Sequence, residues 1–401
     1  MENRDFIITS LQPWDIEIGS TIKNTALELS KKNRVLYLNT PLDHTTWLRG
    51  GKSAALRHRL NVLRGRTPAL RQINERMWVA DCPFMIYSIG KLPGTWLFDR
   101  CNRSNNRKIA ARILEAAASL GFRDFIHLID TDIYRSQYLK EYIRPALSIY
   151  YCRDFVIGES YWKKNGTRLE PLLAAKSDLV LANSTHFAAR LKVYNPHTYP
   201  IETGVNLNLY DARKPWDMPA DLAPVPHPII GYVGTVNSTR LDADLLYRLA
   251  EARPGYNFVF TGPEDEVFAR HPLHKLKNVW FLGKKPVAVL PAYITGYDVC
   301  INPQMVNEIT DGNYPLKIDE YLAMGKPTVA TSTHTMRDIF RDYVFLATGE
   351  AEYLDAFDRA LATAADPALK EARIRFAHTH SWEKSVGKIY QIIEQFQTEN
   401  K

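Results

Sequence analysis

The stretch that organises the rest of the chain reads NEITDGNYPLKIDEYLAMGKPTVAT, at residues 307–331. It begins as a polar loop, and from Pro315 the spacing predicts a short helix, because proline fits the first helical position. A glycine ends this helix, and residues 327–330 predict the next buried strand. Lys317 and Glu320 are three residues apart, so they share one face of the first helical turn. A cation and a carboxylate at a helix N-terminus can hold a phosphate and a hydroxylated ring, although an isolated pair of this kind is usually a solvated ion pair.

The chain opens with the alternation of strands and helices that is typical of an α/β protein. Residues 6–10 predict a buried strand, Ser20 predicts the cap of a helix that runs to about Lys32, and residues 34–39 predict the next strand. A strand, a helix and a second strand in this order indicate the start of a parallel sheet.

A segment rich in proline, aspartate and alanine interrupts this alternation at residues 211–228. It has no apolar periodicity, so its composition predicts a linker. Strands and helices start to alternate again at residues 229–233. We therefore predict an α/β fold of two doubly wound Rossmann-like domains that face a cleft, where ligands of such sheets bind.

Length and composition describe an ordinary globular protein. The 401 residues suffice for two or more domains, and 45% of them are hydrophobic and 24% charged. No stretch approaches 18 uncharged apolar residues, and the first ten residues lack the apolar core of a signal peptide. The cysteines are scattered without a Cys-x-x-Cys pair, which predicts neither a disulfide framework nor a zinc site: Cys82, Cys101, Cys152 and Cys300. We expect a reducing, cytoplasmic compartment.

Basic residues are concentrated between residues 49 and 76. Glu75 is the only acid among eight basic residues, which are Arg49, Lys52, Arg57, Arg59, Arg64, Arg66, Arg71 and Arg76. Such a segment suits an anionic partner, either membrane headgroups at the inner face of the membrane or a polyprenyl-phosphate-linked sugar. A solvated insertion is an equal alternative. Nucleic acid is the least favoured partner, because no recognition motif accompanies the charge.

Four stretches in the second half carry a resemblance to a known family. They read GYVGT at 231–235 with Arg240 six residues after the second glycine, FVFTGP at 258–263, NVWFLG at 278–283 and PLKIDEYLAMGKP at 315–327. Together they resemble the C-terminal domain of GT-B glycosyltransferases, which have two Rossmann-like domains. The chain is similar to the large retaining, family four-like group that uses nucleotide-diphosphate sugars.

This resemblance implies a division of labour along the chain. Residues 1–212 would bind the acceptor, residues 213–375 would bind the nucleotide sugar, and a last helix within residues 376–401 would pack back on the first domain. The donor would be of the UDP or GDP type, and no further cofactor would be needed.

The resemblance also implies roles for residues of the opening stretch. Glu320 takes the place of the glutamate that holds the ribose hydroxyls. The glutamate that grips the donor sugar should lie eight residues earlier, where this chain has Gly312. Contact with the sugar would then shift to Glu308, Asp311 or Asn313.

The glycine turn implies the binding of a diphosphate. Gly234, Thr235 and Gly262 would line the nucleotide site by resemblance. The family's first basic residue after the turn is replaced by Thr235, and the second falls on Arg240. Arg240 and Lys317 would together clamp the pyrophosphate and stabilise the leaving group without a metal.

In the first half, Gly19 and Ser20 lie where the loop after the first strand meets a helix N-terminus, which is a natural anion site. By resemblance they match a glycine loop over the donor phosphates, and a simple helix cap is the alternative. His127, Asp130 and Asp154 lie at predicted strand ends that face the cleft. Asp130 or His127 would serve as a base in an inverting enzyme or orient the acceptor in a retaining one, unless these three are strand-end caps or core polar groups.

Two Asp-x-Asp sequences compete with this interpretation, because that pattern binds metal diphosphates in single-domain glycosyltransferases. They lie at residues 130–132 and 242–244, and Asp242 opens a predicted helix, where acids are favoured in any case. His271, His274, His378 and His380 lack the spacing of metal ligands. We predict no metal site.

The function that these observations favour is a retaining, metal-independent glycosyltransferase. It would move a sugar from a nucleotide-diphosphate sugar to a glycan or lipid-linked acceptor in polysaccharide or glycolipid assembly. One alternative is a nucleotide-sugar epimerase of the same fold. The other is a non-catalytic sugar- or lipid-binding subunit that has lost the glutamate at Gly312.

Overall fold

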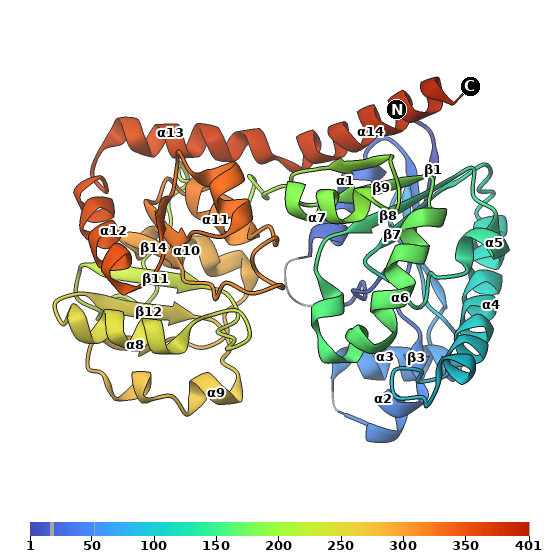
Figure 1. Cartoon of the computed structure of the whole chain (residues 1–401), viewed down its shortest axis with the longest axis horizontal. Coiled ribbons are helices and arrows are strands. Elements are labelled where there is room, and N and C mark those ends of the chain that lie inside the picture. The colour runs from blue at the N-terminus through green and yellow to red at the C-terminus, as the bar shows by residue number, and fades with distance from the viewer. Residues whose placement is uncertain (17–19, 52, 401) are drawn as a thin grey trace. The chain divides into compact units, whose positions relative to one another are not determined.

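A computed structural model describes residues 1–16, 20–51 and 53–400 and divides the chain into two compact units (Figure 1). The first unit holds Met1–Ile201 and Val386–Lys401, and the second holds Glu202–Ser385. The boundaries that the sequence predicts lie at residues 212 and 375 instead.

The first unit contains an eight-stranded sheet in the order β10-β9-β8-β7-β1-β2-β5-β4. All neighbouring strands are parallel except β4 and β5. The strands are β1 Asp5–Ser10, β2 Arg34–Leu38, β4 Leu70–Asn74, β5 Met77–Ala80, β7 Ile126–Asp130, β8 Leu147–Cys152, β9 Leu179–Ala182 and β10 Thr198–Pro200. A separate pair joins β3 Leu42–Asp43 to β6 Met85–Ile86.

Helices cover both faces of this sheet. They are α1 Thr21–Ser30, α2 His44–Arg49, α3 Ala54–Leu63, α4 Thr95–Ser119, α5 Leu139–Ile143, α6 Ser160–Lys176, α7 Thr185–Lys192 and α14 Trp382–Glu399, with a 3-10 turn at Val156–Gly158. In β1, Phe6 and Ile8 pack on the side of α1, whereas Ile7 packs on the side of α4. Burial on both faces explains the continuous apolar run that the sequence shows at residues 6–8.

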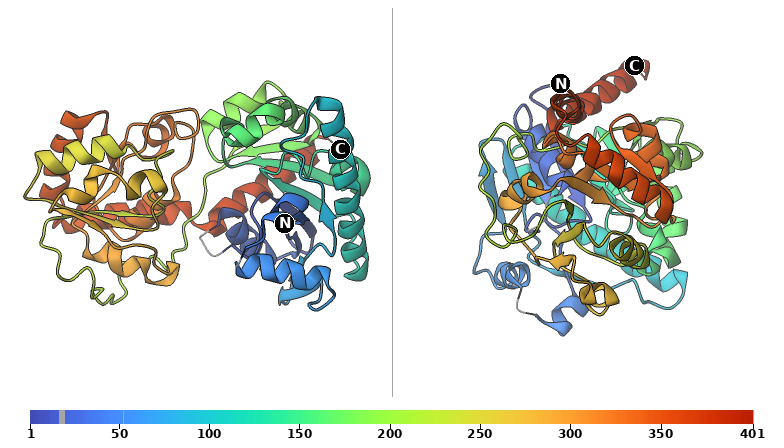
Figure 2. Two further views of the ribbon diagram at one scale, coloured as in Figure 1. Left: turned by 90° about the horizontal axis from the view of Figure 1, so that it is seen from below. Right: turned by 90° about the vertical axis from the view of Figure 1, so that its left-hand side faces the viewer.

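Helix α14 completes the core of the first unit. Val386, Ile389 and Ile393 lie on one helical face and pack with Phe6 and Ile8 of β1. Both ends of the described chain belong to this unit, and Figure 2 shows the N-terminus beside α14. The Met1 ammonium lies 2.9 Å from Glu394 Oε1.

The second unit contains a parallel sheet in the order β13-β12-β11-β14-β15-β16. Its strands are β11 Ile229–Val233, β12 Asn257–Thr261, β13 Val279–Phe281, β14 Val299–Asn302, β15 Thr328–Thr331 and β16 Phe345–Ala347. Its helices are α8 Ala243–Ala252, α9 Glu266–Ala269, α10 Leu290–Gly296, α11 Leu316–Ala323, α12 Glu350–Ala362 and α13 Pro367–Ala377, with short turns at Pro272–Lys275, Val287–Val289, Met336–Phe340 and His378–His380. Helices α8 and α12 pack on one face of the sheet, and α10 and α11 on the other. The predicted α/β class with doubly wound sheets is confirmed.

The segment at residues 211–228 is not the free linker that its composition predicts. It forms no helix or strand, as expected, but Leu222 and Val225 are buried in the core of the second unit. Leu222 occupies the space beside Gly296, where a Cβ would come within 2.5 Å of it. Its large apolar side chains (Trp216, Met218, Leu222 and Val225) are scattered among prolines and aspartates and show no periodicity, so the prediction of a linker was wrong.

Within the part of the chain that the structure describes, no helix has the length and apolar character that a membrane crossing requires.

Candidate functional site

The strand order of the second unit creates a natural binding edge. Strand β11 is flanked by β12 on one side and β14 on the other, so the direction of winding reverses between β11 and β14. In parallel sheets, ligands bind beyond the carboxyl ends of the strands at such a reversal. Here those ends lead into Gly234 and into the loop that begins at Pro303.

Two glycine turns meet at this edge. A Cβ at Gly262 would lie 1.8 Å from the carbonyl oxygen of Gly234, so only glycine fits there. Gly234 has a φ of 133°, a conformation that side chains rarely adopt, and its N–H donates to the carbonyl oxygen of Thr261 at 3.0 Å. Thr235 is exposed. The turn therefore presents backbone to a ligand without intervening side chains.

Lys317, in the first turn of α11, lies against this turn. Its Nζ donates to the hydroxyl of Tyr232 at 2.7 Å and lies 4.4 Å from the centre of the Tyr232 ring. The same Nζ is 3.3 Å from the position that a Cβ of Gly234 would take. The Tyr232 hydroxyl in turn donates to the carbonyl oxygen of Thr235 at 3.1 Å. A fixed positive charge thus sits beside open backbone, which is an arrangement suited to phosphate.

Glu320 lies three residues after Lys317 in α11 and is partly buried. Burial raises the pKa of its carboxyl to about 7, against a hydrogen bond from Tyr210 and the charge of Lys317, which both lower it. This carboxyl therefore changes its protonation state near neutral pH. In the ionised form it can accept two vicinal hydroxyls, as the predicted contact with ribose requires.

Asp319, between these two residues, points into the core instead. It is fully buried, and its oxygens lie 2.8 Å from His380 Nδ1 and 2.5 Å from the Tyr314 hydroxyl. Burial lowers the pKa of His380, but the hydrogen bond and charge of Asp319 outweigh it, so the net shift is upward. This buried pair anchors the inner side of α11.

The loop after β11 is joined to the loop after β14, which brings Arg240 to the same edge. The N–H of Met305 donates to the carbonyl oxygen of Arg240 at 2.9 Å, and the N–H of Asp242 donates to that of Pro303 at 3.2 Å. Asp242 also caps α8, accepting from Leu245 N–H at 2.9 Å. Asp242 of the second Asp-x-Asp sequence therefore has the helix-capping place that its position predicts.

The three residues predicted to replace the missing sugar contact lie in different surroundings. Glu308 is exposed. Asp311 accepts from the N–H of His334 at 2.7 Å and so fixes the loop that follows β15. Asn313 is buried, at 6% exposure. Their contact with a sugar stays a prediction.

The sequence did not single out two polar residues at the end of β14. Asn302 is buried, and neither of its side-chain polar atoms has a hydrogen-bond partner among the described residues. Gln304 Oε1 is in the same condition. Tyr232 and Tyr210 were also missed. Tyr232 stands between the two glycines of GYVGT, a position that could have drawn attention to it.

In the first unit, Ser20 takes the capping place that was its alternative reading. Its Oγ accepts from Lys23 N–H at 3.4 Å and donates to Gln12 Oε1 at 2.6 Å. Ser20 is 4% exposed. Gly19 lies outside the described residues, and a role of either residue in binding phosphate stays a prediction.

Asp130 does not present a free carboxylate. It ends β7 as predicted, but it is fully buried, paired with the Arg153 guanidinium and hydrogen-bonded to Ser10 Oγ at 2.6 Å. Asp132 is buried as well and pairs with Arg135 at 2.9 Å. The sequence placed Asp130 at the strand end correctly, but it could not show that Arg153 covers the carboxylate.

The structure corrects the predicted position of His127. It was expected at a strand end, yet it is the second residue of β7 and is fully buried. Its Nε2 lies 2.9 Å from Thr9 Oγ1, and burial lowers its pKa to about 3. His127 is therefore a neutral core residue in this structure. Asp154, in contrast, follows β8, and its side chain is 31% exposed at 3.6 Å from Arg153 Nη1.

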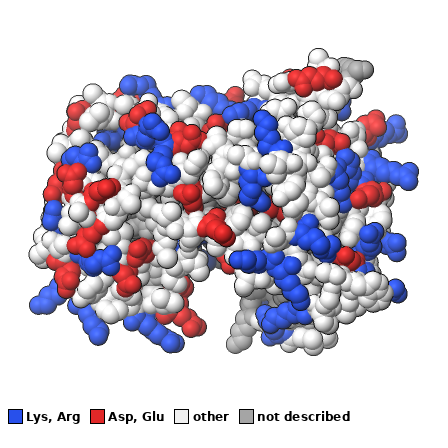
Figure 3. All heavy atoms as spheres, viewed as in Figure 1, with Lys and Arg blue, Asp and Glu red and all other residues white. Residues whose placement is uncertain are grey.

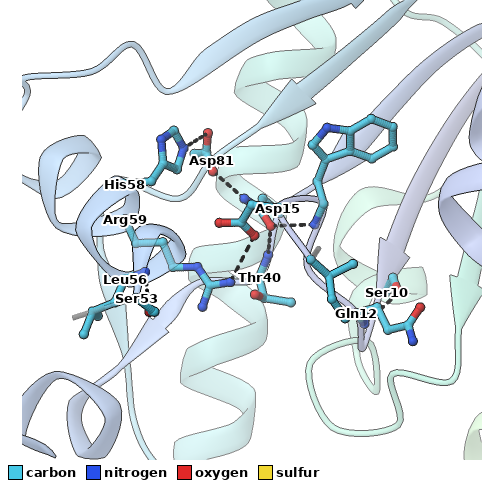
Figure 4. A network of polar contacts seen from close by, with 12 residues as sticks. Ser10, Gln12, Asp15, Thr40, Ser53, Leu56, His58, Arg59 and Asp81 are labelled. Carbon is cyan, nitrogen blue, oxygen red and sulfur yellow. Dashed lines mark hydrogen bonds and ion pairs between the residues drawn. The ribbon is translucent and has the colours of Figure 1, made fainter. Parts of the chain in front are cut away.

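Part of the basic segment is tied to acids from elsewhere in the first unit. Figure 4 shows Arg59 beside Asp15 and His58 beside Asp81, at 3.4 Å and 3.0 Å. Arg71 also lies 3.6 Å from Asp81. The other five described arginines of the segment are exposed: Arg49, Arg57, Arg64, Arg66 and Arg76. Lys52 lies outside the described residues.

Residues 227–365 match the family model named Glycosyl transferases group 1. These residues form a glycosyl transferases group 1 domain. It contains both glycine turns, Lys317 and Glu320, so the resemblance stated from the motifs is confirmed.

Known proteins place this domain in a wider context. A stretch of 202 residues is 28% identical to TuaH of Bacillus subtilis, by name a teichuronic acid biosynthesis glycosyltransferase, and covers 49% of each protein. The chain thus spans about half the length of this relative.

Two solved structures share the fold over nearly the whole chain. HepE of Anabaena, in complex with UDP, matches with a TM-score of 0.65 at 15% identity, covering 98% of this chain and all of the other. Sucrose-phosphate synthase of Thermosynechococcus elongatus matches with a TM-score of 0.70 at 15% identity, covering 99% and 100%. These likenesses confirm the predicted GT-B fold of two Rossmann-like halves.

Proposed function

We propose that the protein is a glycosyltransferase that moves a sugar from a nucleotide-diphosphate sugar to a glycan or lipid-linked acceptor in surface-polysaccharide assembly. The observation that carries the proposal is the position of Lys317 against the Gly234 turn, with Glu320 beside it, inside the glycosyl transferases group 1 domain. The name of TuaH supports the polysaccharide, and the UDP complex of HepE supports a UDP-type donor.

In this proposal the donor binds at the carboxyl edge of the second unit. Its diphosphate lies on the backbone of Gly234 and Thr235, where Lys317 and Arg240 neutralise the charge that grows on the leaving group. Glu320 accepts the ribose hydroxyls. Two cations at this position supply the electrostatic stabilisation that a metal ion gives in other transferases, so we propose a metal-independent reaction.

We further propose that the anomeric configuration is retained and that the first unit supplies the acceptor side. Among the three residues first considered for catalysis, Asp154 is the one with solvent access, and it is the one we place near the acceptor. Asp130 acts through Arg153 as a buried positioning pair, because a covered carboxylate cannot receive a proton from a substrate.

The first test compares Lys317→Ala with Lys277→Ala, a variant of an exposed lysine before β13, at the opposite edge of the sheet. A charge-assisted bond to phosphate contributes about 1.5–3 kcal/mol, so Lys317→Ala is expected to weaken UDP binding about tenfold or more. Isothermal titration measures this loss. Equal UDP affinity in both variants would show that the site is misplaced.

Product analysis separates the alternatives. A panel of UDP and GDP sugars is incubated with the protein, and the products are followed by mass spectrometry and NMR. A glycosyltransferase releases nucleoside diphosphate, by transfer or slow hydrolysis. An epimerase returns an isomeric sugar. A non-catalytic subunit binds without turnover, which would give weight to Gly312 in place of the family's glutamate.

We propose a cytoplasmic protein that also attaches to the inner face of the membrane through residues 49–76. Figure 3 shows Lys and Arg side chains gathered over the region of α3. Large apolar side chains of the same unit are exposed nearby in sequence, with Trp47 at 47% and Leu48 at 74%. Exposed arginines next to tryptophan and leucine are typical of a surface that meets anionic headgroups.

Vesicle binding tests this attachment. Arg57→Glu with Arg64→Glu is expected to abolish sedimentation with phosphatidylglycerol vesicles at low salt, whereas Arg107→Glu with Lys192→Glu, at exposed positions of α4 and α7, keeps it. Added salt should weaken the wild-type interaction, because exposed charges are screened. Equal binding to neutral and anionic vesicles would refute the attachment.

A further inference from the structure

The second unit has a hollow near the amino end of strand β16, whereas the proposed donor site lies at the carboxyl ends of the strands. It measures about 440 Å³ and lies between the start of edge strand β16 and helices α12 and α13, both labelled in Figure 1. Its lining consists of Arg341, Asp342, Tyr343, Val344, Phe345, Leu346, Arg359, Leu369, Ala372 and Arg373. The donor residues lie instead where β11 and β12 end. A volume of this size accommodates a small organic ligand.

The charge of the hollow is positive. It has three guanidinium groups and one carboxylate, that of Asp342. Arg341 is exposed, and its Nε donates to the carbonyl oxygen of Arg337 at 2.8 Å. Arg359 pairs with Asp355 at 2.8 Å and extends over the ring of Phe345. Both side chains retain N–H groups beyond these contacts, because a guanidinium carries five donors.

Arg373 is the most informative of the three, because it is only 5% exposed. It donates to the carbonyl oxygen of Gly325 at 3.4 Å and to Thr363 Oγ1 at 3.0 Å, and both of these partners are neutral. Among the described residues Asp366 is the acid that acts on its charge, but no ion pair within 4.0 Å joins the two, and burial lowers the pKa of Arg373. Buried charges in proteins are normally paired, so a guanidinium at the base of a hollow is a site prepared for an anion.

The remaining lining can hold the organic part of a ligand. Tyr343 is stacked on Phe376 with ring centres 3.9 Å apart, which fixes its orientation. Phe345, Leu346 and Leu369 complete an apolar wall. A bare inorganic anion would leave this wall unused, whereas a phosphorylated sugar would cover it with its ring.

We propose that this hollow binds a sugar phosphate, with the phosphate on Arg373, Arg341 and Arg359 and the sugar ring on Tyr343 and Leu346. The site also has a path to α11. Gly325 follows the end of that helix. A Cβ built on Gly325 would lie 2.6 Å from the side chain of Lys370 in α13. Because Arg373 donates to the carbonyl oxygen of Gly325, an anion bound to Arg373 acts on the C-terminal end of α11, the helix whose first turn carries Lys317. This regulatory half rests on the proposed function, whereas the binding half does not.

Titration calorimetry tests the site with three probes: glucose 1-phosphate, inorganic phosphate and glucose. Glucose 1-phosphate is expected to bind more tightly than phosphate, and glucose not to bind. Arg341→Gln with Arg359→Gln, two exposed positions, should weaken binding at least tenfold, and Arg373→Gln should do the same. Arg375→Gln, on the exposed side of α13, should leave it unchanged.

Lys317→Ala separates this site from the donor site, since it should lose UDP and keep glucose 1-phosphate. Loss of glucose 1-phosphate in Lys317→Ala but not in the arginine variants would overturn the proposal, as would the absence of binding at millimolar concentration. Saturation with glucose 1-phosphate should change the UDP affinity of the wild type at least threefold. An unchanged UDP affinity would overturn the coupling through Gly325 even if the hollow binds its ligand.

Discussion

Three charged residues of α11 show how a shift of one position in a helix decides whether a side chain faces the core or a ligand. Lys317 and Glu320 lie three positions apart and share a partly exposed face, whereas Asp319 turns about 100° from Glu320 and enters the core. There it meets His380 and Tyr314. The helix is thus held from inside by a buried pair while its outer face remains available to a ligand.

Glu320 makes the proposed site sensitive to pH. With a pKa of about 7 in the free protein, its carboxyl becomes a better acceptor for ribose hydroxyls as the pH rises. We expect the affinity for UDP to increase between about pH 6 and pH 8 and the increase to be lost in Glu320→Gln. Calorimetry across this range measures it, after correction for the titration of the UDP phosphate.

The same shift predicts the opposite trend for stability. A carboxyl whose pKa is raised in the folded state binds its proton more tightly there than in the unfolded chain. Its contribution is therefore present below its ordinary pKa of 4.5 and is lost as the pH rises towards 7. Glu320→Gln should flatten the pH dependence of the unfolding midpoint in this window. An unaltered dependence would mean that Glu320 is not shifted.

The elements that carry the proposed site of the second unit could be predicted from the sequence, because each of its motifs is contiguous. Lys317 and Glu320 lie three positions apart in one helix, and each glycine follows its strand directly, so parallel strands bring these short motifs to one edge of the sheet. Asp130 and His127 could not be judged in the same way. Whether they are covered depends on Arg153 and Thr9, which come from other strands of the sheet.

At the scale of elements, the contact between the turns after β11 and β12 fixes the floor of the proposed site. Gly262→Ala would place a methyl group 1.8 Å from the carbonyl oxygen of Gly234, so one turn must move. We expect a loss of about 1–3 kcal/mol in unfolding free energy. UDP affinity should fall as well, because the backbone under the diphosphate is displaced.

Gly255→Ala is the matched control, since a Cβ there would meet nothing within 4 Å. Chemical denaturation and UDP titration of both variants measure the difference. If Gly262→Ala bound UDP as well as Gly255→Ala does, the glycine turns would not form the phosphate site.

The extent of the elements was less predictable than their kind. The sequence of residues 104–120 predicts a helix, whereas the helix observed there, α4, spans Thr95–Ser119 and so starts nine residues earlier. Its first turns have exposed Trp96, an apolar residue where an amphipathic pattern would place a polar one. The irregular segment at residues 211–228 packs by isolated side chains, which leave no periodic signal.

At the scale of the whole molecule, the last helix links the stability of the first unit to the end of the chain. Ile389 and Ile393 of α14 are almost fully buried against β1 and β2, which lie more than 300 positions earlier in the sequence. The apolar spacing in α14 predicts a buried face but not the sheet that it covers, which the resemblance to GT-B enzymes indicated and the packing on β1 agrees with.

Ile389→Ala and Ile393→Ala should each destabilise the first unit by roughly 2–5 kcal/mol, since each empties part of a packed core. Gln391→Ala, an exposed position of the same helix, is the control. Hydrogen exchange should increase in peptides from β1 and stay unchanged in peptides from β11. Equal effects on both peptides would mean that the two units unfold as one.

The meeting of Gly234 and Gly262 also has a genetic consequence. The atom that excludes a side chain at Gly262 is a backbone carbonyl oxygen, which every amino acid carries. No substitution at position 234 can remove that obstacle, and a larger residue there would itself be strained. A suppressor screen that starts from Gly262→Ala should therefore recover reversion to glycine rather than compensating changes within the turn. Neither glycine of this pair can therefore be replaced stepwise through a compensating change in the other.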